Sequence, residues 1–209
     1  QLHDLGHTGS GVLIAVLDDG FQRDHTALQH IDVVAQYDFI NRDSIVAFQP
    51  GQDAVRQGHH GTQVLATLAA YQPGELIGPA YNASFLLAKT EQWGSEMPVE
   101  EDYWVAAAEW AERKGADVLT SSLGYFDWYT YDDLDGNTAL VTKAADLAVK
   151  KGMVVLTSAG NWRRDPWHYI APPADGDSVL AVGAVDTRGV IAYFSSVGPT
   201  VDGRIKPEV

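Results

Sequence analysis

Three polar side chains in this sequence are of the types that together catalyse acyl transfer. Asp18 closes an apolar run, His60 stands at the start of a helical segment, and Asn161 follows another apolar run. A carboxylate can hold an imidazole in one tautomer, the imidazole can act as general base, and an amide N–H can stabilise a developing oxyanion. A further segment, 122–124, follows a third apolar run, and an extended segment of this kind can pair with a peptide as an added strand.

Each of these features has a plainer interpretation when it is taken alone. Asp-Gly and Gly-Asn after a strand are common turn sequences, so Asp18-Asp19-Gly20 and Gly160-Asn161 also fit simple turns. The segment 122–124 likewise fits a strand exit with a glycine turn. The chemical interpretation therefore depends on all of these groups lying at one place in the fold.

The histidine pair also allows two other interpretations, a helix cap and a metal site. His59 and His60 are adjacent, and neighbouring positions on a helix do not share a face, so the pair is a poor chelate. Because side chains alternate along a strand, only one of Asp18 and Asp19 can reach His60.

Five short apolar runs rich in β-branched residues predict strands. Most are nearly continuous, as expected for strands that are buried on both faces of a parallel sheet. The predicted strands are 12–17, 84–89, 117–121, 153–158 and 179–185.

Three segments between these runs have apolar residues at helical spacing. The predicted inward positions are Gly61, Val64, Leu65 and Leu68 in the first, Trp104, Ala107, Ala108 and Ala111 in the second, and Leu140, Ala144 and Leu147 in the third. Asn137 or Thr138 is predicted to cap the third helix, and Gly152 to end it. Strands and helices alternate, which predicts an α/β fold: a doubly wound, mostly parallel sheet with helices on both faces. Such sheets bind ligands at the carboxyl ends of their strands, where the polar groups above are placed.

Composition narrows the class of protein and of partner. The 209 residues fit one domain, 1–209, with a single core, and no run is long and apolar enough for a membrane span. The formal charge of -14 disfavours nucleic acid as a partner. Cysteine is absent, which excludes disulfides, Cys-ligated zinc and a thiol nucleophile. No signal peptide is visible in the given chain.

The joint order of these segments resembles the subtilisin-like serine proteases, the subtilases of peptidase family S8. The matching segments are GVLIAVLDDG, HHGTQVLATLAA, GPAYNASFLLAKT, GADVLTSSLGY, GMVVLTSAGN, VLAVGAV and FSSVGPTVDGRIKPEV. They extend from about Ser10 to the last residue and look close to a Bacteroidetes-type branch of the family.

The resemblance implies a role for each matching residue. Asp18 would be the orienting carboxylate, His60 the general base and Asn161 the oxyanion donor. The other positions that it implies are a substrate-binding strand of Ser122, Leu123 and Gly124, and a specificity pocket lined by Ala159 and Gly160, which the family uses mainly for apolar or large side chains.

The sequence departs from the family pattern at the nucleophile. The family serine stands in a Gly-Thr-Ser-x-Ala segment, and no Gly-Thr-Ser occurs here. Ser158, Ser195 and Ser196 fall in segments that resemble other parts of the family. We therefore expect a catalytic domain truncated before the nucleophile segment, with the serine beyond Val209 and the given chain inactive alone.

Smaller departures concern neighbours of the site. Asp19 stands where Ser or Thr usually follows the aspartate, and Gln63 replaces a histidine that is more usual after His-Gly-Thr. Ala27 stands where many relatives have an aspartate that binds calcium. This position weakens a calcium prediction. No cofactor and no metal site are predicted, with calcium left as an unsupported possibility.

The predicted function is that of a serine endopeptidase acting on peptide or protein substrates, outside the cell or in the periplasm or cell envelope. The alternative is a non-catalytic relative that binds peptides. A small-molecule hydrolase or nucleotide enzyme ranks last, because the sequence has no Gly-x-Ser-x-Gly elbow, P-loop or GxGxxG after a strand. Aromatic residues in 125–131 and 162–169 either line an extended cleft or pack as a loop scaffold, and the sequence does not decide between these.

Overall fold

The computed structural model describes residues 2–209, which divide into two compact units, 2–119 and 120–209. Six strands belong to a mostly parallel sheet: β2, β5 and β1 lie in the first unit, β7 and β8 in the second, and β6 spans the boundary. The strands are β1 (Leu13–Asp18), β2 (Asp32–Asp38), β3 (Tyr71–Gln72), β4 (Leu76–Ile77), β5 (Ser84–Lys89), β6 (Val118–Ser121), β7 (Val154–Ser158) and β8 (Leu180–Val182). The α-helices are α1 (His59–Ala69), α2 (Val99–Arg113) and α3 (Leu140–Lys150), and the 3-10 helices are His3–Leu5, Thr26–Leu28 and Tyr131–Asp133.

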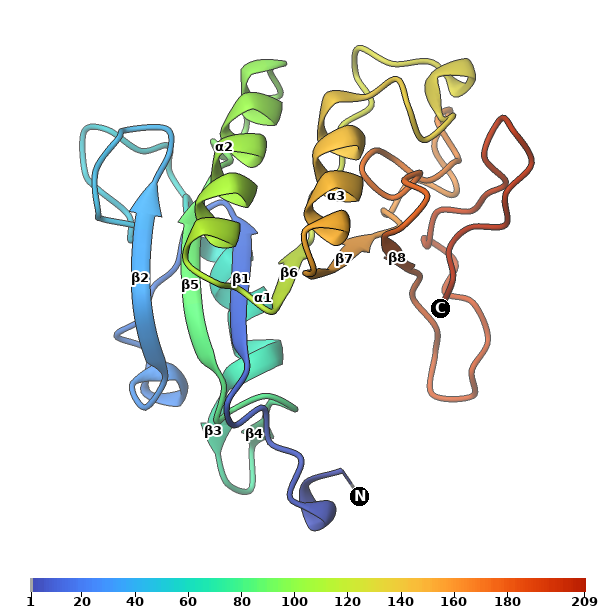
Figure 1. Ribbon diagram of the computed structural model, residues 1–209. Helices are drawn as coiled ribbons and strands as arrows, with labels where there is room; N and C mark the ends of the chain where they lie inside the picture. Colours follow the sequence, from blue (N-terminus) through green and yellow to red (C-terminus); the bar gives the residue numbers. More distant parts are fainter. Residues whose placement is uncertain (1) are drawn as a thin grey trace. The chain divides into compact units, whose positions relative to one another are not determined.

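The first unit is a parallel three-stranded arrangement with a helix on each face. β5 lies between β2 and β1, and Leu13 is in register with Ser84. Figure 1 shows α2 in front of these strands and α1 behind them. Successive side chains of β1 point to opposite faces, so Ile14 and Val16 pack into the core on the α1 side with Leu65. Asp18 lies two residues after Val16 on the same strand, so its side chain points to the same face, toward α1.

The α1 and α2 faces agree with the sequence prediction. Leu65 and Gly61 are buried on α1, with Val64 and Leu68 partly buried against the same core. Trp104 has no exposed surface. Ala107, Ala108 and Ala111 are buried on the same helix. The predicted apolar positions on both helices are therefore confirmed, and α2 buries Glu100 and Glu101 in addition.

The second unit places α3 against β7, which pairs in parallel with β8, and here the predicted helix face is wrong. Leu140 and Leu147 are exposed, whereas Val141, Thr142, Ala145, Asp146 and Ala148 are buried. Thr142 Oγ1 donates to Asp175 Oδ1 at 2.6 Å, and Asp146 Oδ1 accepts from the Ser178 N–H at 2.8 Å. The helix thus buries the neighbouring apolar stripe of Val141, Ala145 and Ala148, and these two hydrogen bonds support that orientation.

The predicted cap of α3 is also wrong. Neither Asn137 nor Thr138 caps this helix, whose N-cap position is Ala139, without a side-chain hydrogen bond. Asp135 Oδ1 instead accepts from the backbone N–H groups of Asn137 and Thr138, at 2.7 Å each. These residues therefore belong to a turn built on Asp135.

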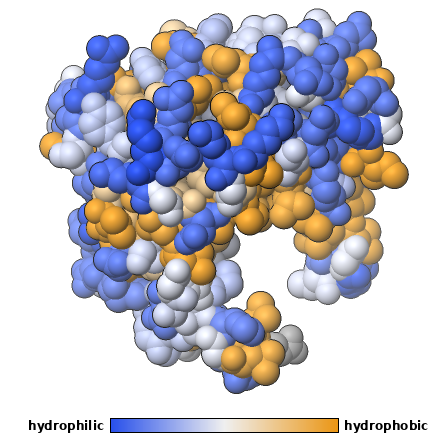
Figure 2. All heavy atoms as spheres, in the orientation of Figure 1, coloured by the Kyte–Doolittle hydropathy of each residue, from blue (hydrophilic) through white to orange (hydrophobic). Residues whose placement is uncertain are grey.

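The surface is polar over much of one side. Figure 2 shows hydrophilic residues gathered over the region where α2 lies in Figure 1. None of the helices in residues 2–209 has the length and apolar character that a membrane crossing requires.

A buried cluster of three charges anchors the segment between β2 and α1. Lys89 Nζ, with no exposed side-chain surface, lies 2.8 Å from Asp38 Oδ2 and 2.5 Å from Asp53 Oδ1. Asn41 Nδ2 donates to both carboxylates, at 3.0 and 3.2 Å. The ends of β2 and β5 are thus joined to the chain that leads into α1.

Replacing Lys89 by methionine is expected to lower the free energy of unfolding by about 3–5 kcal/mol, because two buried carboxylates lose their only charge partner in the described chain. Urea denaturation measures this change. The matched control is Arg113→Met, which breaks an exposed pair with Glu109 (both side chains 67% exposed) and should cost at most about 1 kcal/mol. Equal losses in the two variants would contradict the assignment of stability to the buried cluster.

Candidate active site

Asp18 is the last residue of β1 and is completely buried. Its Oδ1 lies 2.7 Å from His60 Nδ1 and also accepts from the Asp19 N–H at 2.8 Å. Its Oδ2 is buried without a hydrogen-bond partner among the described residues. Burial raises the pKa of Asp18 from its ordinary 3.8 to about 6, against the opposing effect of the His60 hydrogen bond.

His60 lies in the first turn of α1, and its side chain is 41% exposed. The hydrogen bond to Asp18 raises the pKa of this imidazole above its ordinary value, although partial burial opposes the rise. Because Nδ1 is engaged by Asp18, Nε2 is the nitrogen left for proton exchange. A buried carboxylate holding an exposed imidazole through Nδ1 is the arrangement that general-base catalysis requires.

Gly61 explains why the helix can start so close to the strand. A Cβ on this residue would lie 2.9 Å from the Asp18 Cβ and would overlap the carbonyl oxygen of Gly20. Any larger residue would therefore push α1 away from β1 and lengthen the contact between His60 and Asp18.

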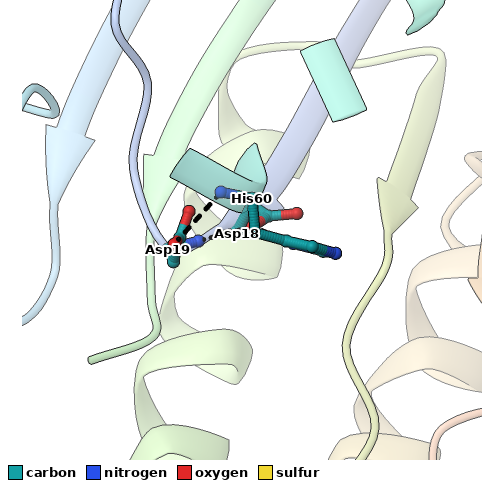
Figure 3. Close-up of side chains that lie close together, drawn as sticks. All are labelled: Asp18, Asp19 and His60. Atoms are coloured by element: carbon teal, nitrogen blue, oxygen red, sulfur yellow. Dashed lines mark hydrogen bonds and ion pairs between the residues drawn. The ribbon is translucent and has the colours of Figure 1, made fainter. Parts of the chain in front are cut away.

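Asp19 has a role that sequence reasoning missed. Its Oδ1 accepts from the Gly61 N–H at 2.7 Å, and its Oδ2 lies 3.4 Å from the His60 backbone nitrogen (Figure 3). The N-cap residue of α1, Gly58, provides no side-chain cap. Asp19 thus caps α1 from another element, and its negative charge lies at the positive end of the helix dipole. As the sequence predicted, only one of the two aspartates reaches the imidazole.

Asp19 provides no hydrogen bond to the unpaired Asp18 Oδ2. Asp19 stands where the family pattern has a hydroxyl residue. Its carboxylate accepts backbone hydrogen bonds instead of donating one, so it supplies no proton to its neighbour. The site gains a strong helix cap and leaves one buried carboxylate oxygen unpaired.

Replacing Asp19 by alanine is expected to destabilise the protein by about 1–3 kcal/mol, because the buried Gly61 N–H loses its acceptor. Asp19→Asn keeps an oxygen acceptor and should recover most of the loss. Asp24→Ala, at an exposed position, is the control and should change the unfolding free energy by no more than about 0.5 kcal/mol in urea denaturation. An equal loss for Asp19→Asn and Asp19→Ala would show that the oxygen acceptor is not what matters.

The other predicted site residues lie in the second unit. Ser122, Leu123 and Gly124 follow β6 and are half-buried. Ala159 is buried, and its N–H donates to Val182 O at 2.9 Å.

Gly160 and Asn161 follow Ala159 in the chain. Gly160 has φ of 101°, a left-handed backbone that favours glycine. Asn161 is exposed, and its side chain makes no hydrogen bond within residues 2–209, so its amide is available to a ligand.

The aromatic residues of the second unit pack against each other. Phe126 lies edge-on to Trp162, with ring centroids 4.6 Å apart, and stacks on Trp167 at 5.1 Å. Trp162 also lies against Gly124: a Cβ there would be 3.0 Å from its Cη2 atom. The cluster is a scaffold that touches the segments predicted to bind substrate.

Within residues 2–209, two groups of side chains bring metal-ligating atoms within 4.8 Å of one another: Asp18 with Asp19 and His60, and Glu91 with Glu96 and Glu100. In the first group, Asp18 Oδ1, both Asp19 oxygens and His60 Nδ1 already make the hydrogen bonds described above. In the second group Glu100 accepts from two backbone N–H groups, those of Gln92 and Met97. We propose no metal at either group.

A hollow of about 290 Å³ lies beside the start of α1 and is separate from the Asp18–His60 pair. Its lining residues are Gln22, His25, Leu28, His59, Thr62, Gln63 and Ala66. His59 thus points to a different surface from His60, as expected for neighbours on a helix.

The fold and the Asp18–His60 pair define a subtilisin-like α/β protein. Residues 9–209 match the subtilase family, peptidase S8, and the chain belongs to that family. The family and the fold class predicted from the sequence are both confirmed.

Individual relatives agree with this assignment. The chain is 34% identical over 199 residues to Subtilisin DY of Bacillus licheniformis, covering 94% of this chain and 65% of the relative. It is 31% identical over 183 residues to the minor extracellular protease Vpr of Bacillus subtilis, covering 87% of this chain and 21% of the relative. Among solved structures, a protease from Pseudoalteromonas arctica superposes with a TM-score of 0.72 at 25% identity, covering 93% of this chain and 62% of that one. The chain thus spans less than two thirds of the length of each.

Proposed function

We propose that this chain is part of a serine endopeptidase, and that the nucleophilic serine lies beyond Val209 in the complete protein. The observation that supports the proposal most directly is the 2.7 Å contact between Asp18 Oδ1 and His60 Nδ1, with the carboxylate buried and the imidazole half-exposed. Family membership and the relatives named as proteases support the same conclusion.

Each residue has a defined part in the proposed reaction. His60 Nε2 takes the proton of the serine hydroxyl as its oxygen attacks the peptide carbonyl carbon, and Asp18 stabilises the imidazolium that forms. The Asn161 amide donates a hydrogen bond to the oxyanion. His60 then gives the proton to the leaving amine, and water hydrolyses the acyl-enzyme with the same base.

The substrate is proposed to pair with Ser122, Leu123 and Gly124 as an added strand, with Ala159 and Gly160 lining the pocket for the side chain before the scissile bond. Peptides and proteins are the proposed partners. The net charge of -14 argues against nucleic acid. We propose an extracellular or envelope location, which the extracellular relative supports. The Bacteroidetes-type branch remains a proposal from the sequence resemblance.

The full-length natural protein tests this proposal. We expect it to cleave peptides, to gain the mass of one adduct from a serine-reactive phosphonate, and to lose hydrolysis in proportion to that adduct. The competing function is peptide binding without turnover. Measurable peptide affinity with no cleavage and no adduct would establish that alternative and overturn the endopeptidase.

A further inference from the structure

Trp162 directly follows the proposed oxyanion donor, and its ring lies against two glycines from the proposed substrate-binding segments. A Cβ on Gly124 would lie 3.0 Å from its Cη2 and 3.3 Å from its Cζ3. A Cβ on Gly160 would overlap the same Cζ3 atom. One edge of the indole therefore approaches both segments, which are far apart in the sequence.

The backbone beside this ring is held in place. Ser196 is completely buried, its Oγ accepts from the Trp162 N–H at 2.9 Å, and its own N–H donates to Gly160 O at 2.9 Å. The next residue, Arg163, donates its N–H to Phe194 O at 3.1 Å. Trp162 can therefore leave the glycines only by rotating its side chain.

The ring itself is also supported on its outer side. Phe126 contacts Trp162 edge-on at 4.6 Å and stacks on Trp167, whose Nε1–H donates to Ile170 O at 2.9 Å. Rotation of Trp162 would give up the contact with Phe126, and such aromatic pairs are worth about 0.5–1.5 kcal/mol beyond their area.

We propose that Trp162 determines specificity by filling the pocket between Gly124 and Gly160, so that the enzyme selects peptides with a small side chain, glycine or alanine, before the scissile bond. This inference rests on the proposed function, which assigns that pocket to those two segments. It departs from the preference for apolar or large side chains that the family resemblance implies. The indole occupies the volume that a large side chain would need, and the glycines cannot move back without disturbing the strands they follow.

The first experiment compares kcat/KM for two peptides that differ only before the scissile bond, one with alanine and one with phenylalanine, using the full-length protein. Wild type should prefer alanine. Trp162→Ala should raise the phenylalanine-to-alanine ratio by about 10- to 100-fold, as expected when a hydrophobic pocket gains room for several carbon atoms. Trp162→Phe should give an intermediate ratio.

The matched control is Trp110→Ala. Trp110 is also half-buried and also meets a single phenylalanine edge-on, Phe39 at 6.0 Å, but it lies on α2, in the first unit. This variant should change the ratio less than threefold. If wild type prefers phenylalanine, or if Trp162→Ala leaves the ratio unchanged while the protein remains folded by circular dichroism, the inference is wrong.

A binding measurement separates this inference from the proposed function. In a full-length His60→Ala background, calorimetry with the same two peptides should show tighter binding of the alanine peptide, and adding Trp162→Ala should reverse that order. If wild type cleaves nothing but the order reverses, the pocket assignment stands and the endopeptidase fails. If wild type cleaves peptides but Trp162→Ala changes neither the binding order nor the cleavage ratio of the two peptides, only the inference about Trp162 fails.

Discussion

Replacing His60 by alanine in the full-length protein is expected to lower kcat for peptide hydrolysis by about 10⁶-fold, because the reaction loses both its base and its acid. The geometry supports this role, because His60 Nδ1 lies 2.7 Å from the buried carboxylate of Asp18 while the His60 side chain is 41% exposed. Steady-state kinetics with a fluorogenic peptide measures the loss. Phosphonate labelling should slow in parallel, since the same base activates the serine toward the probe.

His59 provides a control from the same helical turn. It is the neighbouring histidine, it is exposed, and it faces the separate hollow beside α1. His59→Ala should keep kcat within about threefold and should leave the unfolding transition unchanged. Similar losses in the two variants would indicate that both histidines serve one structural or metal-binding purpose, and the proposed triad would be wrong.

The parts of the fold that the sequence predicted well are those in which one physical signal dominates. β5 was predicted with its observed bounds, Ser84–Lys89, because a continuous apolar run has few alternatives to a strand buried on both faces. β2 (Asp32–Asp38) was missed because its residues are mixed and half-exposed, as in an edge strand. β8 is shorter than predicted, because Gly183 and Ala184 turn their N–H groups to Val209 O and Ser195 Oγ.

Some contacts of the candidate site could be predicted from the sequence, and others could not. Asp18 and His60 could be placed together from the sequence, since a strand end and a helix start meet at one edge of a parallel sheet. The cap that Asp19 provides for α1 joins residues 42 positions apart, and no local pattern contains that information. The position of Trp162 was equally hidden, because the sequence shows an aromatic cluster and not which glycines it touches.

Replacing Asp18 by asparagine is expected to lower kcat by about 10⁴-fold and to move the pH profile. The amide can hold His60 only by accepting or donating a weaker hydrogen bond, so the ring loses both its preferred tautomer and the stabilisation of its charged form. In wild type, activity requires Asp18 ionised and His60 neutral. The pKa of Asp18 is raised to about 6 and that of His60 is raised above its ordinary 6.5, so kcat/KM should fall as the pH drops through 7 to 6.

The direction in which the pH profile of Asp18→Asn moves distinguishes an electrostatic role of Asp18 from a loss of folded structure. The Asp18 hydrogen bond is the largest cause of the raised pKa of His60, so Asp18→Asn should move the acid limb of kcat/KM to lower pH while the maximum falls. The effect of pH on stability should be opposite to its effect on activity. The pKa of Asp18 is raised on folding, so the protonated carboxyl stabilises the protein below about pH 4, and this contribution is lost as the pH rises through 6. The Asp18→Asn variant should therefore lose the least unfolding free energy above pH 6. Asp24→Asn, at an exposed position, should alter neither profile. An unmoved acid limb in Asp18→Asn would mean that the carboxylate does not set the charge of His60, and the orienting role proposed for it would have to be abandoned.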